Sequence, residues 1–309
     1  MSTNQDNKGK LALITGGTSG IGYELAKQFA ADGFNLVLVA RVTDRLQAVS
    51  DEFKNQYGVQ VHTIEKDLFK PGAAKEIYDE TTRLGQTVDV LVNDAGQGEY
   101  GKFTDTDLDR EIDLIHLDII AVVSLTKFYL KDMVAHNAGK ILQLASTLSK
   151  APTPYMSVYA ASKAFILSFT EALIEELKDT NVTLTALLPG ATDTDFFHKA
   201  GAENTVTYRE TPMYNPEEVA KAGYEGLMSG KNKVIPGAMN KTQSFMSTLM
   251  PDGAVTSMMN KQMQESDKED GKETIGHAAS AAERNSISKT TQSADKDLQD
   301  HEGHVHEEK

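Results

Sequence analysis

Short, nearly continuous apolar runs alternate with longer amphipathic stretches between residues 11 and 235. The runs are rich in Val, Ile, Leu and Ala and mostly lack the strict polar–apolar alternation of a half-exposed strand. Strands of a parallel sheet have this composition because helices cover both faces of the sheet. The runs predict strands at residues 11–15, 35–40, 59–64, 88–92, 140–145, 182–188 and 233–235.

The stretches between these runs repeat apolar residues with the period of an α-helix. Residues 107–136 keep this period over many turns and predict one long helix. Strand–helix alternation with short connections predicts an α/β fold: a single domain with a Rossmann-type, doubly wound parallel sheet of about seven strands. Further helices are predicted at residues 22–31, 45–57, 75–84 and 157–178.

The end of the chain differs in composition. No aromatic residue follows Phe245, and from Glu265 onward there are 12 acidic and 6 basic residues with only isolated Ile, Leu or Val. Such a segment buries too little apolar area to offset the entropy of ordering it. We therefore predict a flexible N-terminus at residues 1–8, a folded domain at 9–263 and a disordered acidic tail at 264–309.

Charge and composition limit the partners. The net charge is −14, and the body without the tail still carries about −8. An acidic body argues against nucleic-acid binding, which needs a basic face. Without cysteine there is no disulfide or zinc–sulfur site, and we expect no metal. The polar N-terminus lacks a signal-peptide core and no apolar run approaches the roughly 20 residues of a membrane span, so we expect a cytoplasmic protein.

A glycine-rich loop directly follows the first predicted strand and opens a helix. Glycines at such a point let backbone N–H groups approach a pyrophosphate at the helix N-terminus. A plain structural turn is the alternative, but the position between strand and helix favours nucleotide binding. The candidate cofactor-binding residues of this loop are Thr15, Gly16, Thr18, Ser19, Gly20, Ile21 and Gly22.

The second strand ends at Arg41, where NAD-binding proteins usually carry an acidic residue for the ribose 2′-hydroxyl. An arginine here suits the 2′-phosphate of NADP(H), although a solvated edge residue is the alternative. NAD(H) is the less favoured cofactor. Asp67, at the end of the third strand, can accept a hydrogen bond from the adenine amino group, or simply cap a turn.

Tyr159 and Lys163 lie one helical turn apart on the same face of a predicted helix. A free tyrosine has a pKa near ~10, and a neighbouring cation lowers it by stabilising the phenolate. The tyrosine then serves as general acid in carbonyl reduction, or as base in the reverse direction. Ser146 follows the fifth strand and can hydrogen-bond the substrate oxygen; the nearby Ser149 is interpreted as loop polarity.

These motifs, in this order, resemble those of the short-chain dehydrogenase/reductase family in its NADP-preferring form. The resemblance spans about residues 8–240 and includes Asn93-Asp94-Ala95-Gly96 and Pro189-Gly190. It implies that Ser146 positions the substrate, Tyr159 transfers the proton, and Lys163 binds the nicotinamide ribose and lowers the tyrosine pKa. It also implies a homodimer or homotetramer. The remaining cofactor-binding candidates are Asn93, Ala95, Gly96, Pro189, Gly190, Thr192 and Thr194, together with Tyr159 and Lys163.

Two positions depart from the family pattern. Asp94 replaces the second asparagine of the usual Asn-Asn-Ala-Gly, and Asp118 stands where the family often has a catalytic asparagine. An ionised aspartate only accepts hydrogen bonds, whereas asparagine also donates. Asp118 therefore puts the family's water-mediated proton relay in question and can raise the pKa of Lys163 or Tyr159. Alternatively, Asp118 binds a water or a backbone amide and activity survives.

Two segments near the C-terminal end of the domain are candidates for the substrate side. Residues 195–215 lack strong periodicity, which is typical of a lid over a site, although a surface loop is the alternative. Methionines recur at loosely helical spacing between residues 239 and 263. We interpret them as a helix packed on its own domain, with a flexible pocket wall or partner surface as the alternatives.

The sequence thus predicts an oxidoreductase that transfers a hydride between NADP(H) and a small-molecule carbonyl or alcohol, with Tyr159 as general acid/base. The alternative is an NADP(H)-binding regulator or sensor with weak or no catalysis, suggested by Asp118 and the acidic tail. A pure binder does not need Ser146, Tyr159 and Lys163 together, which favours the enzyme.

Overall fold

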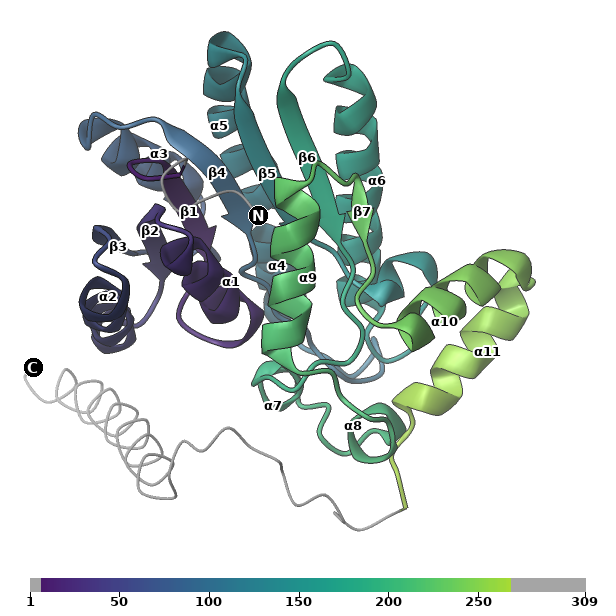
Figure 1. Cartoon of the computed structure of the whole chain (residues 1–309). Coiled ribbons are helices and arrows are strands. Elements are labelled where there is room, and N and C mark those ends of the chain that lie inside the picture. The colour runs from purple at the N-terminus through teal and green to yellow at the C-terminus, as the bar shows by residue number, and fades with distance from the viewer. Residues whose placement is uncertain (1–6, 268–309) are drawn as a thin grey trace, which may run out of the picture. The chain divides into compact units, whose positions relative to one another are not determined.

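The computed structural model describes residues 7–267, and a seven-stranded parallel sheet forms the centre of this domain (Figure 1). The strand order is β3-β2-β1-β4-β5-β6-β7, so the chain reverses direction across the sheet between β1 and β4. All seven predicted strands are confirmed, and β3 starts two residues later than predicted. The strands are β1 (Leu11–Thr15), β2 (Asn35–Ala40), β3 (Val61–Glu65), β4 (Val88–Asn93), β5 (Gly139–Leu144), β6 (Val182–Leu187) and β7 (Lys233–Val234).

Helices cover both faces of the sheet, as the buried strands require. On one face α1 (Gly20–Ala31), α2 (Thr43–Tyr57) and α9 (Pro216–Met228) pack on Ala12 and Ile14 of β1. On the other face α3 (Ala73–Arg83) and α5 (Val122–His136) pack on Leu11 and Leu13. Alternate β1 side chains thus enter opposite cores, which confirms the doubly wound Rossmann-type fold.

The helix predicted at 107–136 is continuous but not uniformly α-helical. It consists of α4 (Leu108–Ile115), a π-helical segment η1 (His116–Ala121) and α5. The wider π turn lies where Asp118 is fully buried, and such local widenings are frequent at functional sites. The spacing of apolar residues in the sequence does not reveal the π-helical segment, because one wider turn changes that spacing very little.

The C-terminal part of the domain is helical. The predicted lid contains two short helices, α7 (Phe196–Ala200) and α8 (Val206–Glu210), and the methionine-rich segment forms α10 (Ala238–Leu249) and α11 (Asp252–Met263). Val255 and Met259 of α11 pack on Ala151 of the body, which supports the interpretation of a helix packed on its own domain.

Both ends of the folded part extend slightly beyond the predicted limits. Asn7 is buried and its side-chain amide donates to Asp32 Oδ2 at 2.6 Å. At the other end the Ser266 amide donates to the Asn204 carbonyl at 2.8 Å. Polar contacts of this kind, one between side chains and one between backbone groups, need no apolar residues, so composition did not indicate them. Most of the predicted tail, residues 268–309, and the predicted flexible residues 1–6 lie outside the described residues.

Candidate active site

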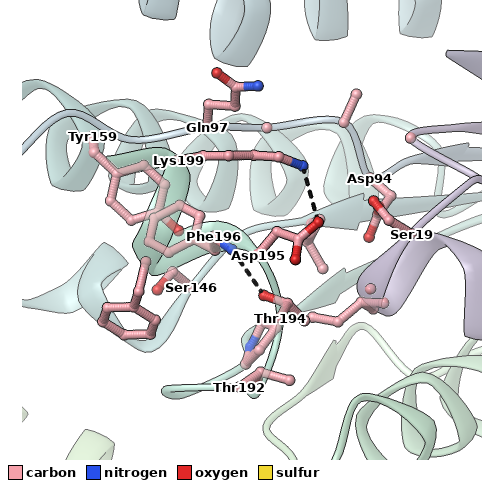
Figure 2. A pocket seen from close by; sticks show the side chains of 18 of the residues that line it. Ser19, Asp94, Gln97, Ser146, Tyr159, Thr192, Thr194, Asp195, Phe196 and Lys199 are labelled. Carbon is pink, nitrogen blue, oxygen red and sulfur yellow. Dashed lines mark hydrogen bonds and ion pairs between the residues drawn. The ribbon is translucent and has the colours of Figure 1, made fainter. Parts of the chain in front are cut away.

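A cavity of about 340 Å³ opens at the carboxyl edge of the sheet, where the loops after β1, β2, β4, β5 and β6 meet. Ligands of open α/β sheets bind at this edge, next to the point where the strand order reverses. Figure 2 shows Ser19 and Asp94 at one side of this pocket and Ser146 and Tyr159 at the other. The predicted site residues that line it are Gly16, Thr18, Ser19, Gly20, Ile21, Arg41, Asp67, Ala95, Gly96, Ser146, Tyr159, Pro189, Gly190, Thr192 and Thr194.

The glycine loop is shaped for close approach of a ligand to backbone. Gly16 and Gly20 have φ angles of +73° and +56°, which other residues rarely adopt. A Cβ on Gly22 would collide with the Gly16 carbonyl oxygen and the Asp94 carboxyl group. The loop is therefore a cradle of bare backbone at the start of α1, and this geometry fits a pyrophosphate.

Thr15 lies behind this loop rather than in the pocket. Its hydroxyl accepts hydrogen bonds from the Asp94 and Ala95 amides, each at 3.1 Å, and so fixes the loop after β4 against the end of β1. Gly22 and Asn93 also do not line the pocket. The Asn93 amide donates to Gln143 Oε1 at 2.9 Å inside the sheet. We therefore interpret Thr15, Gly22 and Asn93 as residues that shape the cofactor site from behind.

Basic side chains gather at the end of the pocket near β2. The Arg41 guanidinium lies 5.0 Å above the ring of Phe69, which orients it at the pocket edge. Arg45 on α2 also lines the pocket, and its Nη1 lies 3.9 Å from Asp195 Oδ2. Sequence reasoning did not select Arg45, because its approach to the pocket depends on how α2 packs. Asp67 Oδ1 accepts from the Phe69 amide at 3.1 Å, so the predicted turn cap is present beside the pocket.

The catalytic candidates meet at the opposite end. Ser146 caps a short 3₁₀ helix, η2 (Thr147–Lys150), and its Oγ accepts from the Leu148 amide at 3.1 Å. Ser149, interpreted above as loop polarity, accepts from the Ser146 amide at 3.2 Å and donates to the Lys163 carbonyl at 2.8 Å. Ser149 therefore ties the Ser146 turn to α6 (Ser157–Glu176), the helix that carries Tyr159 and Lys163.

Lys163 and Asp118 form a buried pair beneath the pocket. Lys163 Nζ lies 3.8 Å from Asp118 Oδ2, and their side chains are 5% and 0% exposed. Lys163 also donates to the Leu144 carbonyl at 3.3 Å. Asp118 accepts from Ser162 Oγ at 3.1 Å and from the Gln97 amide at 3.3 Å. Burial raises the pKa of Asp118, and Lys163 partly opposes that rise.

The electrostatics of Tyr159 differ from the expectation for an isolated tyrosine–lysine pair. The Lys163 ammonium lies 5.5 Å from the centre of the Tyr159 ring. Burial nevertheless raises the pKa of Tyr159, the Asp118 charge raises it further, and hydrogen bonding with Ser146 lowers it. The expectation that Asp118 raises the pKa of Tyr159 agrees with this, and a lowering of that pKa by Lys163 stays a prediction.

An apolar wall faces the catalytic end of the pocket. Phe196 of α7 lies 4.9 Å from the Tyr159 ring, centroid to centroid, and Figure 2 shows the two side by side. A Cβ on Gly98 would approach Phe196 and Met156 within 3 Å, so this glycine makes room for the wall. The predicted lid therefore lines the site. The wall consists of Leu148, Met156, Phe196, Phe197, Met239 and Met263.

Helix α6 is, among the described residues, the one helix long and apolar enough to cross a membrane by length and composition. It nevertheless carries Tyr159 and Lys163 into the site and packs against β5 and β6 in the core. We therefore interpret α6 as a core helix of the domain.

Comparison with known proteins agrees with this geometry. The sequence profile described as short chain dehydrogenase matches residues 10–205. A very-long-chain 3-oxoacyl-CoA reductase of Anas platyrhynchos is 30% identical over 82% of this chain and 80% of its own length. Its human counterpart is 35% identical over 59% of each chain, so the match spans just under three fifths of that relative. A 3-oxoacyl-[acyl-carrier-protein] reductase of Aquifex aeolicus is 29% identical over 69% of this chain and 88% of its own.

Solved structures extend the comparison to three dimensions. A short-chain dehydrogenase from Sphingobium yanoikuyae in complex with NADPH superimposes with a TM-score of 0.71 and 29% identity, covering 84% of this chain and 99% of the other. An alcohol dehydrogenase from Thermococcus sibiricus complexed with 5-hydroxy-NADP gives 0.65 and 26%, over 73% and 95%. The profile match over residues 10–205 and the relative that is 30% identical over 82% of this chain show that this chain belongs to the short-chain dehydrogenase family of oxidoreductases.

Proposed function

We propose that the protein is an NADP(H)-dependent reductase that converts an apolar ketone to a secondary alcohol. The observation that carries this proposal is one pocket with a bare-backbone cradle at one end and Tyr159 with Ser146 at the other. An extended dinucleotide with its pyrophosphate on the cradle would place its reactive ring toward the tyrosine. When bound, NADPH supplies the hydride, and the protein supplies orientation and the proton.

The residues that line the pocket fit the cofactor. The backbone of Gly16 and Gly20 would receive the pyrophosphate, and Arg41 with Arg45 would receive the 2′-phosphate. Arg41 is preoriented by Phe69, so little side-chain entropy is lost when it binds an anion. Arg41 and Arg45 at the β2 end of the pocket favour NADP(H) over NAD(H), because only NADP(H) carries the 2′-phosphate.

Tyr159 supplies the proton in the reduction direction. Because its pKa is raised, the phenol stays protonated at neutral pH, which is the form that donates to a carbonyl oxygen. The Ser146 oxygen accepts from the Leu148 amide, and its proton, which hydrogen-bonds Tyr159 here, would be donated to the same carbonyl oxygen when substrate binds. Lys163, held by the Leu144 carbonyl and Asp118, would contact the nicotinamide ribose.

The apolar wall indicates the class of substrate. Phe196 and Met156 face the catalytic tyrosine, and methionines adapt to chains of different shape. Relatives named as 3-oxoacyl-CoA and 3-oxoacyl-carrier-protein reductases suggest 3-oxoacyl thioesters among the apolar ketones. We therefore propose a long or bulky 3-oxoacyl thioester or ketone.

The test is oxidation of NADPH, and separately of NADH, across a panel of ketones and 3-oxoacyl thioesters of increasing chain length. We expect turnover with NADPH that rises with apolar bulk and that Tyr159→Phe abolishes. Tyr155→Phe is the matched control, because this neighbouring phenol does not line the described pocket. Equal activity in wild type and Tyr159→Phe would refute the proposal.

A regulator or sensor is the second candidate, favoured by the buried Asp118 beside Lys163. A carboxylate there weakens the stabilisation of a phenolate and slows any step that needs one. Tight NADPH binding with no turnover on the whole panel would favour the sensor. Restored turnover in Asp118→Asn would then identify Asp118 as the cause of the missing catalysis.

The assembly and location remain predictions. Exposed apolar side chains on α4, η1 and α6 (Ile112, Ile120 and Phe165) are consistent with a homodimer or homotetramer. Light scattering coupled to size exclusion measures this directly. The expected cytoplasmic location is testable by fractionation.

A further inference from the structure

Asp94 occupies an unusual place between the phosphate cradle and the catalytic lysine. It is 9% exposed and lines the pocket, and it lies beside Ser19 in Figure 2. One of its oxygens, Oδ2, faces Gly16 and Gly22, and the Gly22 amide donates to the carboxyl group. The other oxygen, Oδ1, is buried and has no hydrogen-bond partner among the described residues.

This environment disfavours the carboxylate. Burial raises the pKa of Asp94 to about 7, while the Lys163 charge and the Gly22 amide oppose the rise. Both protonation states are therefore populated at neutral pH. The charged group that acts on the Asp94 carboxyl group is Lys163 of α6, which itself pairs with Asp118 of η1. β1 carries no titratable side chain, and the hydroxyl of Tyr23 in the first turn of α1 donates to Glu52 instead.

The carboxylate form conflicts with an anionic ligand. The free N–H groups and positive dipole end at the start of α1 are what would attract a pyrophosphate. An ionised Asp94 accepts one of these N–H groups and places a negative charge at the same helix end. A neutral carboxyl group leaves the helix end electrostatically available.

We propose that Asp94 is a positioning residue that makes dinucleotide binding proton-linked: the neutral carboxyl group admits the pyrophosphate, and the carboxylate opposes it. The inference rests on the proposed function, because it requires that the dinucleotide occupies this pocket. Binding then takes up a proton near neutral pH, and the affinity falls as pH rises. If binding raises the pKa of Asp94 by one unit, the affinity falls about tenfold between the protonated and ionised limits.

Isothermal titration of NADP⁺ into the full chain, at about pH 6 and about pH 8 and in two buffers of different ionisation enthalpy, measures both the dissociation constant and the proton uptake. The cofactor 2′-phosphate itself titrates near about pH 6, so NAD⁺ is titrated in parallel. Asp94→Asn keeps the shape and removes the charge. Asp179→Asn, at an exposed site away from the pocket, is the control for the same change in net charge.

We expect wild type and Asp179→Asn to take up as much as about half a proton near neutral pH and to lose about fivefold in affinity between about pH 6 and about pH 8. We expect Asp94→Asn to show neither effect beyond the 2′-phosphate contribution. Equal proton uptake in wild type and Asp94→Asn would overturn the inference while leaving the proposed function intact. If Asp94→Asn fails to fold, binding of NAD⁺ to wild type without proton uptake would likewise overturn the inference. Absence of dinucleotide binding at every pH would refute the proposed function itself.

Discussion

The raised pKa of Asp94 has a consequence for folding that does not depend on any ligand. In the folded chain its pKa is about 7, against 3.8 for an unperturbed carboxyl group. A carboxyl group whose pKa is raised on folding contributes stability at low pH and loses it as pH rises through the folded value. The loss therefore develops between about pH 4 and about pH 7 and is complete above that window.

The magnitude follows from the size of the shift. About three pKa units correspond to about 4 kcal/mol, and local relaxation around a buried group reduces this to about 2–4 kcal/mol. Asp94→Asn removes the titration but keeps the shape. We expect the unfolding free energy of Asp94→Asn, relative to wild type, to rise by about 2–3 kcal/mol between about pH 5 and about pH 8.

Urea unfolding followed by circular dichroism at both pH values measures this difference. The comparison between pH values cancels any fixed effect of the amide on packing or hydrogen bonding. Asp179→Asn, exposed and away from the pocket, should change the pH dependence by far less. A stability difference between Asp94→Asn and wild type that is the same at both pH values would refute the reasoning.

Three further predictions concern the proposed reaction. Arg41→Ala should raise the KM for NADPH about tenfold or more and change the KM for NADH little, because only the 2′-phosphate contact is lost; parallel initial rates with the two cofactors measure it. Asp118→Asn removes a charge that raises the pKa of Tyr159, so the fall of the reduction rate at high pH should begin at a lower pH. The rate measured against pH tests this, and an unchanged profile would show that Asp118 does not influence the pKa of Tyr159. Gly22→Ala should abolish NADPH binding with the fold retained, because its Cβ meets the Gly16 carbonyl oxygen; fluorescence titration and circular dichroism test both parts.

The fold was predictable because its signals are local. The buried strands appear as continuous apolar runs, and the Rossmann topology follows from their alternation with helices. Tyr159 and Lys163 were predictable for the same reason, since one helical turn fixes their proximity. Ser146 required only its position after β5.

The remaining features depend on contacts between distant segments. The pKa of Tyr159 is raised by burial and by Asp118, 41 positions away in sequence, and neither cause is contained in the local spacing of Tyr159 and Lys163. Asn93 turns into the sheet because Gln143 on the next strand offers a partner there. Arg45 enters the pocket through the orientation of α2, which no short motif encodes.

The pocket is built from two parts of the chain. Met263 lines it, and residues 264–266 pair with the lid. The family profile ends at residue 205, yet the Met263 carbonyl accepts from the Tyr100 hydroxyl at 2.7 Å and Met263 lines the pocket. The cradle and the proposed catalytic side chains thus lie in the matched segment, while Met239 of α10 and Met263 of α11 line the pocket from beyond it. On the proposed function, we expect substitutions in these C-terminal helices to change substrate choice more than the chemical step, and a graft meant to exchange specificity between relatives to need residues up to Ser266.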